Sequence, residues 1–372
     1  MTIPAVLVGL QISAWIGFAL SPARQQRADF RAYYYAGEMI RAGQARNLYQ
    51  RYDPANVTSA FIHPAYEALL FLPLTFMSMR VAHVLWIGLN CGIIYFIYRA
   101  LRPDLLNLHA LFTWLPLGIF AAYLPINEAL MQGQDSLLLA LLVSVAFERL
   151  RRGRLFEAGI WLGLGAFRFQ FLAAIILLFL LWSAWRLIAG CCLSAGGMFL
   201  LSIAIAGFRA QKDYVQLLRV LADPAQQPVI HMVNLRALMT ALGTTSAGIL
   251  AATSVLVLVL VAWFGRAASW HSRLLMSVAA ACLLSYHMFL HDLSLLIVPI
   301  IITCDNALES REYIHLGILA AALAFPTLLA MQGLPLWANS MGSMIVLTQL
   351  VLLGRRYDFM PAKRSFPAEA EA

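Results

Sequence analysis

The sequence predicts an all-α membrane protein that crosses the bilayer about twelve times. Of its 372 residues, 62% are hydrophobic and only 12% are charged, which is about half the charged fraction of a soluble domain. Long apolar runs recur from one end of the chain to the other, and a helix needs about 20 apolar residues to cross a bilayer. The composition therefore excludes a water-soluble globular protein.

Twelve apolar runs account for the predicted crossings. They lie at 3–20, 81–98, 107–124, 134–148, 155–167, 170–184, 187–208, 246–264, 274–290, 292–304, 313–331 and 334–353. No basic residue precedes the first run, so we interpret it as an uncleaved helix and not as a signal peptide. The segment 63–79 is also apolar, but Pro64 and Pro73 interrupt it, and we expect an outer juxtamembrane or re-entrant helix there.

These elements form a single transmembrane domain over residues 1–354, followed by a basic and disordered cytoplasmic tail at 355–372. Two long outer loops, 21–80 and 209–245, interrupt the domain. If the helices alternate in direction, fourteen basic residues of the short loops and the tail fall on one side. The positive-inside rule makes that side cytoplasmic, so both termini of this plasma-membrane protein are expected in the cytoplasm.

Arginine supplies nearly all of the positive charge. The formal net charge is +8, and the 26 basic residues comprise 24 Arg and only two Lys, Lys212 and Lys363. A guanidinium group binds phosphate and carboxylate through two hydrogen bonds, which favours anionic ligands. The five cysteines all lie in apolar runs and show neither a disulfide framework nor a zinc-binding spacing.

Polar residues that are unusual at membrane depth collect on the predicted outer side. They are Asp29, His63, Glu128, Gln134, Arg168, Asn234, Arg236, His291 and Asp292. Each ionisable group inside a membrane costs at least a few kcal/mol, so a chain that keeps several usually uses them. The short runs 155–167, 170–184 and 292–304 meet at such residues, which favours a buried polar cavity.

Asp29 is the candidate general base. It follows the first predicted helix by nine residues and precedes Tyr33 and Tyr34, and a carboxylate there can take the proton from an acceptor hydroxyl. On spacing alone the simpler interpretation, a solvated aspartate paired with Arg27 or Arg31, is favoured. The neighbouring tyrosines are likewise more typical of an interfacial aromatic belt than of a sugar platform.

Arg168 and two histidines are the candidate ligands for an anion. Arg168 has no acidic residue nearby in sequence, so a lipid phosphate and a snorkelling position at the interface are equally open. His287 and His291 are spaced as neighbours on one helix face, and Asp292 follows. No third residue has the spacing of a metal ligand, so a hydrogen-bonding or phosphate-binding role is favoured over metal coordination.

The order of motifs resembles glycosyltransferase family 87, also known as the DUF2029 group. The motifs are DFRAYYYAGEMIRAGQARNLYQ, FIHPAYEALLFLPL with a following VLW, GQDSLLLALL, FEAGIWLGLGAFRFQ, MVNLRALMTAL and FLHDLSLLIVP. The resemblance extends over roughly residues 1–350. Members of this family are polyprenol-phosphate-sugar-dependent membrane glycosyltransferases of the GT-C class, and they include mannosyltransferases that build cell-envelope glycolipids.

This resemblance implies a GT-C fold whose active site faces the outside, with an aspartate after the first helix as catalytic base, the position that Asp29 holds here. It also implies that the acceptor hydroxyl attacks C1 of a hexose with inversion and that polyprenyl phosphate leaves. We expect the donor phosphate to bind Arg168, His291 and Arg236. We expect the substrates to contact Tyr33, Tyr34, His63, Glu128, Gln134, Asn234 and Asp292.

The chain departs from the family pattern at three places. The basic residue after AGIWLGLGAF is usually lysine, with proline two residues later, where this chain has Arg168 and Gln170. Pro64 stands alone where the family has a doubled proline, and Ala237 replaces a frequent glycine. These differences leave the reaction class in place, and they leave the donor sugar and the acceptor open.

Neither a cofactor nor a nucleic-acid partner is expected. The sequence has no phosphate loop of the GxxxxGK[ST] type, which disfavours a nucleotide-sugar donor, and no DxD motif, the usual reason to expect a catalytic metal. The expected partners are the donor, a glycolipid or glycan acceptor, and membrane lipids. The alternatives are a transporter or flippase of lipid-linked sugars, although the two related halves typical of transporters are not evident, and a non-catalytic scaffold.

Overall fold

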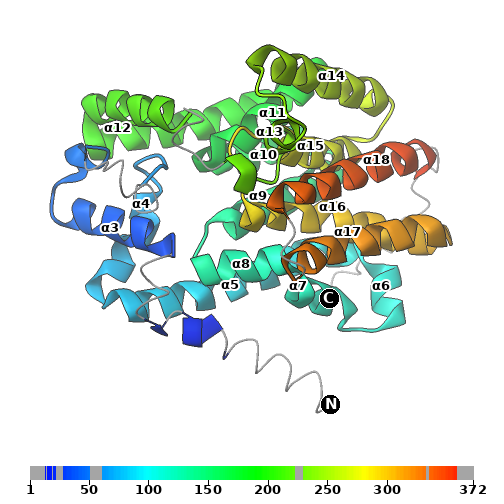
Figure 1. Cartoon of the computed structure of the whole chain (residues 1–372), viewed down its shortest axis with the longest axis horizontal. Helices are drawn as coiled ribbons and strands as arrows, with labels where there is room; N and C mark the ends of the chain where they lie inside the picture. The colour runs from blue at the N-terminus through cyan, green and yellow to red at the C-terminus, as the bar shows by residue number, and fades with distance from the viewer. Residues whose placement is uncertain are drawn as a thin grey trace, which may run out of the picture.

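The computed structural model describes residues 13, 15–18, 20–21, 28–50, 61–222, 229–331 and 335–357 of the chain. This described part contains helices and connecting segments and no β-strand, which confirms the all-α prediction (Figure 1). Five of its helical segments are long and apolar enough to cross a bilayer: Met79–Asp104, Leu155–Leu181, Trp185–Val220, Ala247–Gly265 and Leu290–Glu309. Shorter apolar helices accompany them, and the count of twelve crossings stays a prediction. The predicted first helix at 3–20 and the tail at 355–372 lie largely outside the described residues.

A small helical lobe precedes the first long helix. It contains α3 (Phe30–Arg41), the 3₁₀ turn η1 (Ala45–Asn47), α4 (Ala68–Phe71) and η3 (Leu72–Phe76). Pro73 lies in the first turn of η3, where a helix needs no backbone N–H, so the segment 63–79 forms two short helices and not a continuous one. Phe30, Tyr33 and Phe71 belong to a buried cluster that gives this lobe its own core.

The next segment was predicted as one helix at 81–98 and another at 107–124. The first is α5 (Met79–Leu101), and it ends in η4 (Arg102–Asp104). The second is divided into α6 (Leu106–Leu111) and α7 (Leu115–Ala122), because Phe112 adopts an extended backbone with φ −161° and ψ 125°. The residues that follow, expected as a loop, form α8 (Leu124–Gln132).

Small residues bring two of the central helices into close contact. The central elements are α9 (Ser136–Arg151), α10 (Leu155–Leu164), η5 (Gly165–Arg168), α11 (Phe169–Leu181) and α12 (Trp185–Ala222). A Cβ added to Gly159 would lie 1.9 Å from the Leu187 carbonyl oxygen, and one added to Gly163 would lie 2.1 Å from Ser194 Oγ. This G-x-x-x-G spacing is typical of membrane helices whose backbones touch.

The same contacts fix the direction of three helices. Gly159 faces Leu187 and Gly163 faces Ser194, so α10 and α12 run in the same direction. Because α11 connects the end of α10 to the start of α12, it must run the opposite way. The apolar segment Leu155–Leu181 is therefore two short helices that meet at η5, in agreement with the separate helices expected from the sequence.

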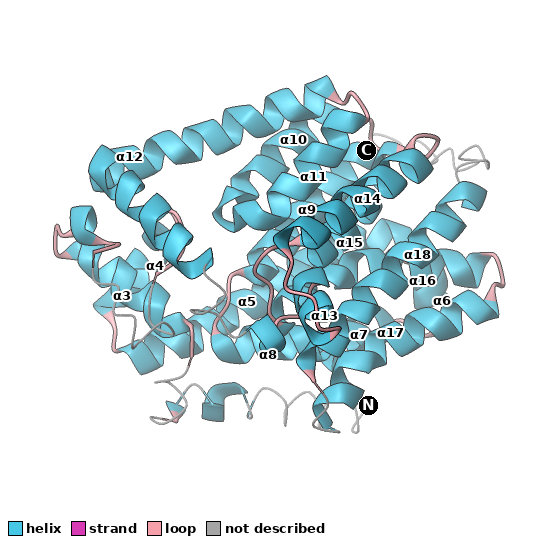
Figure 2. Ribbon diagram, turned by 45° about the horizontal axis from the view of Figure 1, so that its top comes forward, coloured by secondary structure: helices cyan, strands magenta, loops and turns pink. Residues whose placement is uncertain are grey.

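Helix α12 extends into the region that was predicted as the second outer loop. Gly207 interrupts it with φ 81° and ψ 164°, and Figure 2 shows the resulting bend. Residues 208–222 continue as a helix and not as a loop, which corrects the prediction for the first part of 209–245. The reason is an amphipathic spacing, since Ala210, Tyr214 and Leu217 are buried against the small lobe.

The last third of the described chain is also helical. It contains η7 (Val229–His231), α13 (Leu235–Ala241), α14 (Ala247–Gly265), α15 (Trp270–Leu284), η8 (Leu290–Leu296), α16 (Ile297–Glu309), α17 (Tyr313–Met331), η9 (Leu336–Asn339) and α18 (Ser340–Tyr357). Helix α15 stops at Leu284, earlier than the predicted end at residue 290.

Several loops that were predicted on the cytoplasmic side lie together, at what we call the basic end of the bundle. Arg151 Nη1, at the end of α9, lies 2.9 Å from Asp104 Oδ1, in the turn η4 that follows α5. Asp305 Oδ1 accepts a hydrogen bond from the Leu108 backbone N–H at 2.8 Å and joins α16 to α6. From this end, α9 extends over 16 residues, which is about 24 Å of helix.

Candidate active site

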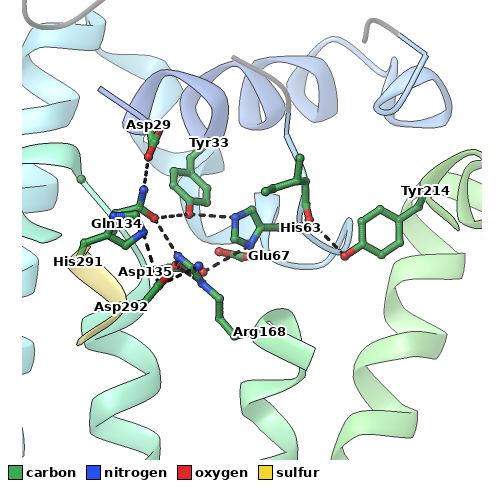
Figure 3. A network of polar contacts seen from close by, with 12 residues as sticks. Asp29, Tyr33, His63, Glu67, Gln134, Asp135, Arg168, Tyr214, His291 and Asp292 are labelled. Carbon is green, nitrogen blue, oxygen red and sulfur yellow. Dashed lines mark hydrogen bonds and ion pairs between the residues drawn. The ribbon is translucent and has the colours of Figure 1, made fainter. Parts of the chain in front are cut away.

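A cluster of polar side chains lies at the end of α9 that is opposite the basic end (Figure 3). Five segments that are distant in sequence supply it. They are the start of α3, the loop 61–67, the junction of α8 and α9, the turn η5, and the turn η8. Most of the polar residues singled out from the sequence lie in these segments, and their convergence depends on the reversal of the chain at η5.

The junction of α8 and α9 places two side chains, Gln134 and Asp135, in the cluster. Gly133 ends α8 with φ +68°, a left-handed conformation that glycine adopts without strain. A Cβ at this position would lie 2.6 Å from the Phe30 Cβ, so glycine also allows α3 to approach the junction. Trp86 Nε1 donates a hydrogen bond to the Gly133 carbonyl oxygen at 2.9 Å and fixes the turn against α5.

Arg168 is the centre of the cluster, and its side chain is buried. Its Nε donates to Asp135 Oδ1 at 2.7 Å, and its Nη2 donates both to that oxygen and, at 2.8 Å, to Gln134 Oε1. Its Nη1 lies 3.1 Å from Asp292 Oδ1. The guanidinium is thus paired with two protein carboxylates from distant segments, which excludes the snorkelling position that the sequence left open.

Gln134 links this centre to Asp29. Its Oε1 accepts from Arg168, and its Nε2 donates to Asp29 Oδ2. Because the oxygen of the amide must face the guanidinium and its nitrogen must face the carboxylate, the orientation of the Gln134 side chain is fixed. Tyr33 Oη donates to the same Gln134 Oε1 at 3.2 Å and completes the link to α3.

Asp29 immediately precedes α3 and is half-buried. Burial raises the pKa of its carboxyl group above the ordinary aspartate value, while His291 and Arg168 oppose the shift. The expected pairing with Arg31 is not what the structure shows, since the Arg31 guanidinium lies over the Tyr35 ring, 5.4 Å from its centroid. Arg27, the other expected partner, lies outside the described residues.

His63 joins the loop 61–67 to the cluster. Its Nε2 lies 3.1 Å from Tyr33 Oη, and its Nδ1 lies 2.9 Å from Glu67 Oε2 and 3.5 Å from Asp135 Oδ2. Burial lowers the pKa of His63 to about 4, so the imidazole is neutral at neutral pH. Within the described part of the chain, His63, Glu67 and Asp135 form the one group whose donor atoms lie close enough to hold a metal ion.

The turn η8 supplies Asp292 and His291. Besides facing Arg168, Asp292 Oδ1 lies 3.4 Å from His291 Nε2. The expectation that His287 and His291 share a helix face was wrong, because α15 ends at Leu284 and η8 begins only at Leu290. The chain between them is not helical, so the sequence spacing of four residues carries no geometric meaning there.

Asn234 and Arg236 lie at the start of α13. Asn234 caps this helix by accepting from the Ala237 backbone N–H at 3.0 Å, and its Nδ2 donates to the Ser285 carbonyl oxygen at 2.7 Å. The Arg236 guanidinium lies over the Tyr286 ring, 4.0 Å from its centroid, and both of its Nη atoms are buried without a hydrogen-bond partner. Asn234 is thus a structural cap, whereas Arg236 presents a buried and unpaired cation.

Two of the expected substrate contacts have partners outside the cluster. Tyr34 Oη donates to the Met77 carbonyl oxygen at 2.6 Å, and Glu128 accepts from Gln132 Nε2 at 3.0 Å along α8. Neither contact connects these residues to Arg168 or Asp29. Contact of Tyr34 and Glu128 with a substrate therefore stays a prediction without support from this geometry.

Sequence reasoning missed two carboxylates of the cluster, Glu67 and Asp135. Asp135 directly follows Gln134 in the quoted motif GQDSLLLALL, and Glu67 follows His63 by four residues in FIHPAYEALL. Four residues is the spacing of neighbours on a helix, and that signal could have drawn attention to Glu67. No sequence signal connects either carboxylate to Arg168. Arg168 contacts Asp135 only because the chain reverses direction at η5 and places Arg168 beside the start of α9.

The comparison with protein families decides the class of this site. A family model described as glycosyltransferase family 87 matches residues 61–299, which is more than half of the chain. The chain belongs to glycosyltransferase family 87. Comparisons with curated proteins and with solved structures gave no match.

As a member of family 87, the protein is a glycosyltransferase, and its apolar helices fit a membrane enzyme. The matched range includes His63, Gln134, Arg168, Arg236 and Asp292, all of which were singled out from the sequence. It begins after Asp29, so the role of that carboxylate depends on its place in the structure.

Proposed function

We propose that this protein is an inverting glycosyltransferase that moves a hexose, with mannose as the first candidate, from a polyprenyl-phosphate donor to a glycolipid or glycan of the cell envelope. The observation that carries the proposal is the placement of Asp29. Its half-buried carboxylate is linked through Gln134 to the buried cation Arg168. An accessible base held by a cluster built around a buried cation fits a reaction in which an acceptor loses a proton and a phosphate leaves.

In this reaction Asp29 takes the proton from the acceptor hydroxyl as its oxygen attacks C1 of the donor sugar. The bond from C1 to the phosphate oxygen breaks, and the electron pair leaves with polyprenyl phosphate. The raised pKa of Asp29 strengthens it as a base. The hydrogen bond from Gln134 orients the carboxylate without neutralising it.

The contacts favour Arg236 over Arg168 as the principal ligand of the donor phosphate. A guanidinium has five N–H donors, and the contacts of Arg168 with Asp135, Gln134 and Asp292 engage four of them. Arg236 has both Nη groups buried and unpaired. An anion is the ligand that such a group requires, because an unpaired buried charge is costly. Arg168 then holds the pocket together and offers one remaining N–H.

The arrangement of the loops supports an active site on the outer face. The cluster and the basic end lie at opposite ends of α9, about 24 Å apart. The basic end contains Arg151 and the neighbouring arginines of the loop 149–154, which the positive-inside rule assigns to the cytoplasm. The cluster around Asp29 then lies on the side of the periplasm or the exterior.

A transfer assay with purified protein in lipid vesicles tests the proposal. Polyprenyl-phosphate-mannose labelled in its sugar is supplied with extracted envelope glycolipids, and the product is analysed for its label and its anomeric configuration. We expect label in the glycolipid fraction with inversion at C1. Transfer from a nucleotide sugar alone, or movement of the lipid donor across the bilayer without transfer, would contradict the proposal.

A further inference from the structure

Three buried atoms with lone pairs converge beside the Arg168 centre (Figure 3). They are His63 Nδ1, Glu67 Oε2 and Asp135 Oδ2, and ligand atoms of these three residues lie within 4.8 Å of one another. The residues are 7%, 0% and 0% exposed. Apart from contacts among these three residues, each of the three atoms is buried without a hydrogen-bond partner, as is the second carboxylate oxygen of Glu67.

The hydrogen bonds around Gln134 determine which nitrogen of His63 carries the proton. Gln134 Oε1 faces Arg168 and can only accept, so Tyr33 must donate its hydroxyl proton to that oxygen. The Tyr33 oxygen is then the acceptor for His63 Nε2, 3.1 Å away. His63 Nε2 therefore carries a proton, and Nδ1 is the ring nitrogen that faces Glu67 Oε2.

Either a proton or a metal cation must therefore lie among the three atoms, because lone pairs that face one another at these distances repel. His63 Nδ1 faces Glu67 Oε2 at 2.9 Å and Asp135 Oδ2 at 3.5 Å. Arg168 cannot compensate for both carboxylates, because its guanidinium is already divided between Asp135 Oδ1 and Asp292. Buried charges normally pair or coordinate a metal ion.

The spacing of the atoms matches that of ligands around one metal ion. Nitrogen and oxygen ligands lie at about 2.0–2.2 Å from zinc, so neighbouring ligands in a tetrahedral or octahedral arrangement are roughly 3–3.5 Å apart. The distances of 2.9 and 3.5 Å from His63 Nδ1 fall at that spacing. Two of the ligands also have the outer support that metal sites require: Tyr33 accepts from His63 Nε2, and Arg168 holds Asp135 Oδ1.

We propose that His63, Glu67 and Asp135 bind a divalent transition-metal ion, with zinc as the best match to one imidazole and two carboxylates. The ion connects the loop 61–67 to the start of α9. By holding Asp135 it also fixes Arg168, and through Gln134 it sets the position of Asp29. This inference is independent of the donor and acceptor of the enzyme, because it concerns binding alone.

Metal analysis of the purified full-length protein tests this inference. The protein is stripped with a chelator, reloaded with zinc, passed through a desalting column and analysed by plasma mass spectrometry. We expect roughly one zinc ion per wild-type chain, and a zinc affinity at least tenfold weaker in Glu67→Gln and His63→Ala. Tyr33→Phe, which removes only the hydroxyl that accepts from His63, should weaken binding by about 10- to 100-fold.

Two matched variants control for non-specific binding. His109→Ala and Glu157→Gln remove an imidazole and a carboxylate outside the cluster and should leave the zinc content unchanged. Thermal stabilisation by zinc, measured on each variant in detergent, separates loss of binding from loss of folding. Wild-type protein that retains no more zinc than Glu67→Gln would overturn the inference. The inference would also be overturned if the infrared spectrum of the zinc-treated wild-type protein showed the carbonyl band of a protonated carboxylic acid and Glu67→Gln removed that band. A proton would then lie where the ion is proposed.

Discussion

Asp29 differs from the other carboxylates of the cluster in being only half-buried, which gives an acceptor hydroxyl access to it. Glu67, Asp135 and Asp292 are fully enclosed, and two of these are paired with Arg168. A general base must reach the proton that it removes. Exposure and hydrogen bonding thus favour Asp29 as the proposed base and a supporting role for the enclosed carboxylates.

The pH dependence of the reaction follows from the pKa of Asp29. Burial raises that pKa while the nearby charges of His291 and Arg168 oppose the shift and Asp292 adds to it. Because the base acts in its ionised form, kcat/KM should fall as the pH is lowered through the raised pKa. An ordinary aspartate has a pKa near 4, and the decline in kcat/KM should begin at a higher pH than that pKa would give. The donor is a phosphodiester that stays ionised over this range, so a flat kcat/KM profile down to about pH 4 would contradict the assignment.

Arg236 is the proposed principal ligand of the donor phosphate. Its buried guanidinium stacks on Tyr286 and has both Nη atoms unpaired, so Arg236→Gln should weaken donor binding by about 1.5–3 kcal/mol, the range of a hydrogen bond to a charged group. The matched control is Arg266→Gln, because Arg266 also stacks on an aromatic ring, that of Trp263, but is exposed. Binding of the labelled lipid donor in nanodiscs measures both. Equal affinity in wild type and Arg236→Gln would remove Arg236 from the phosphate site.

At the scale of the helices, the contact of α10 with α12 holds Arg168 in place. Gly159 and Gly163 allow the two backbones to touch, and η5 follows at the end of α10. If this contact opened, the turn that carries Arg168 would move away from Asp135. The pocket therefore depends on residues that line no part of it.

Gly159→Leu tests this dependence. Its Cβ would lie 1.9 Å from the Leu187 carbonyl oxygen, and an overpacked site typically costs about 1–3 kcal/mol. We expect a lower melting temperature in detergent and reduced transfer activity. Gly196→Leu is the matched control on α12, because no atom lies within 4 Å of a Cβ at that position. Equal stability of the two variants would show that the close contact does not exist.

The sequence predicted most helices by their apolar length, and the errors have local physical causes. The predicted helix 107–124 was wrong because Phe112 interrupts it with an extended backbone. Pro116, in the first turn of α7, was a local signal of this break, because proline in a helix interior removes the hydrogen bond to the residue four positions before it. The region 209–222 was wrong in the other direction, because a charged amphipathic helix resembles a loop in composition. The spacing of Ala210, Tyr214 and Leu217 was a local signal of this helix, whereas the small lobe that buries these residues is distant in sequence.

The polar residues of the pocket were partly visible in the sequence. Asp29, His63, Gln134, Arg168 and Asp292 were singled out because polar groups at membrane depth are unusual, and the structure joins all five in one network. The partners of Arg168 could not be predicted, because Asp135 and Asp292 come from other helices.

For the whole molecule, the central expectation is that the pocket and the basic end lie on opposite sides of the membrane. Cysteine labelling in intact cells tests it. Gln44→Cys lies in the small lobe and Arg152→Cys lies in the basic loop 149–154, and both positions are exposed. A membrane-impermeant maleimide should label Gln44→Cys alone, and permeabilised cells should show labelling of both. Labelling of Arg152→Cys in intact cells would contradict the proposed orientation.

The most direct measurement is the rate of sugar transfer by Asp29→Asn in lipid vesicles with polyprenyl-phosphate-mannose. The amide keeps the shape of the side chain and removes the base, so we predict a loss of at least about a hundredfold in kcat, within the range of general base catalysis, with donor binding unchanged. Glu38→Gln, which changes a half-buried carboxylate on the same helix that pairs with Arg41, should keep the wild-type rate. Wild-type activity in Asp29→Asn would contradict the account, because the Asp29 carboxylate would then not be the base.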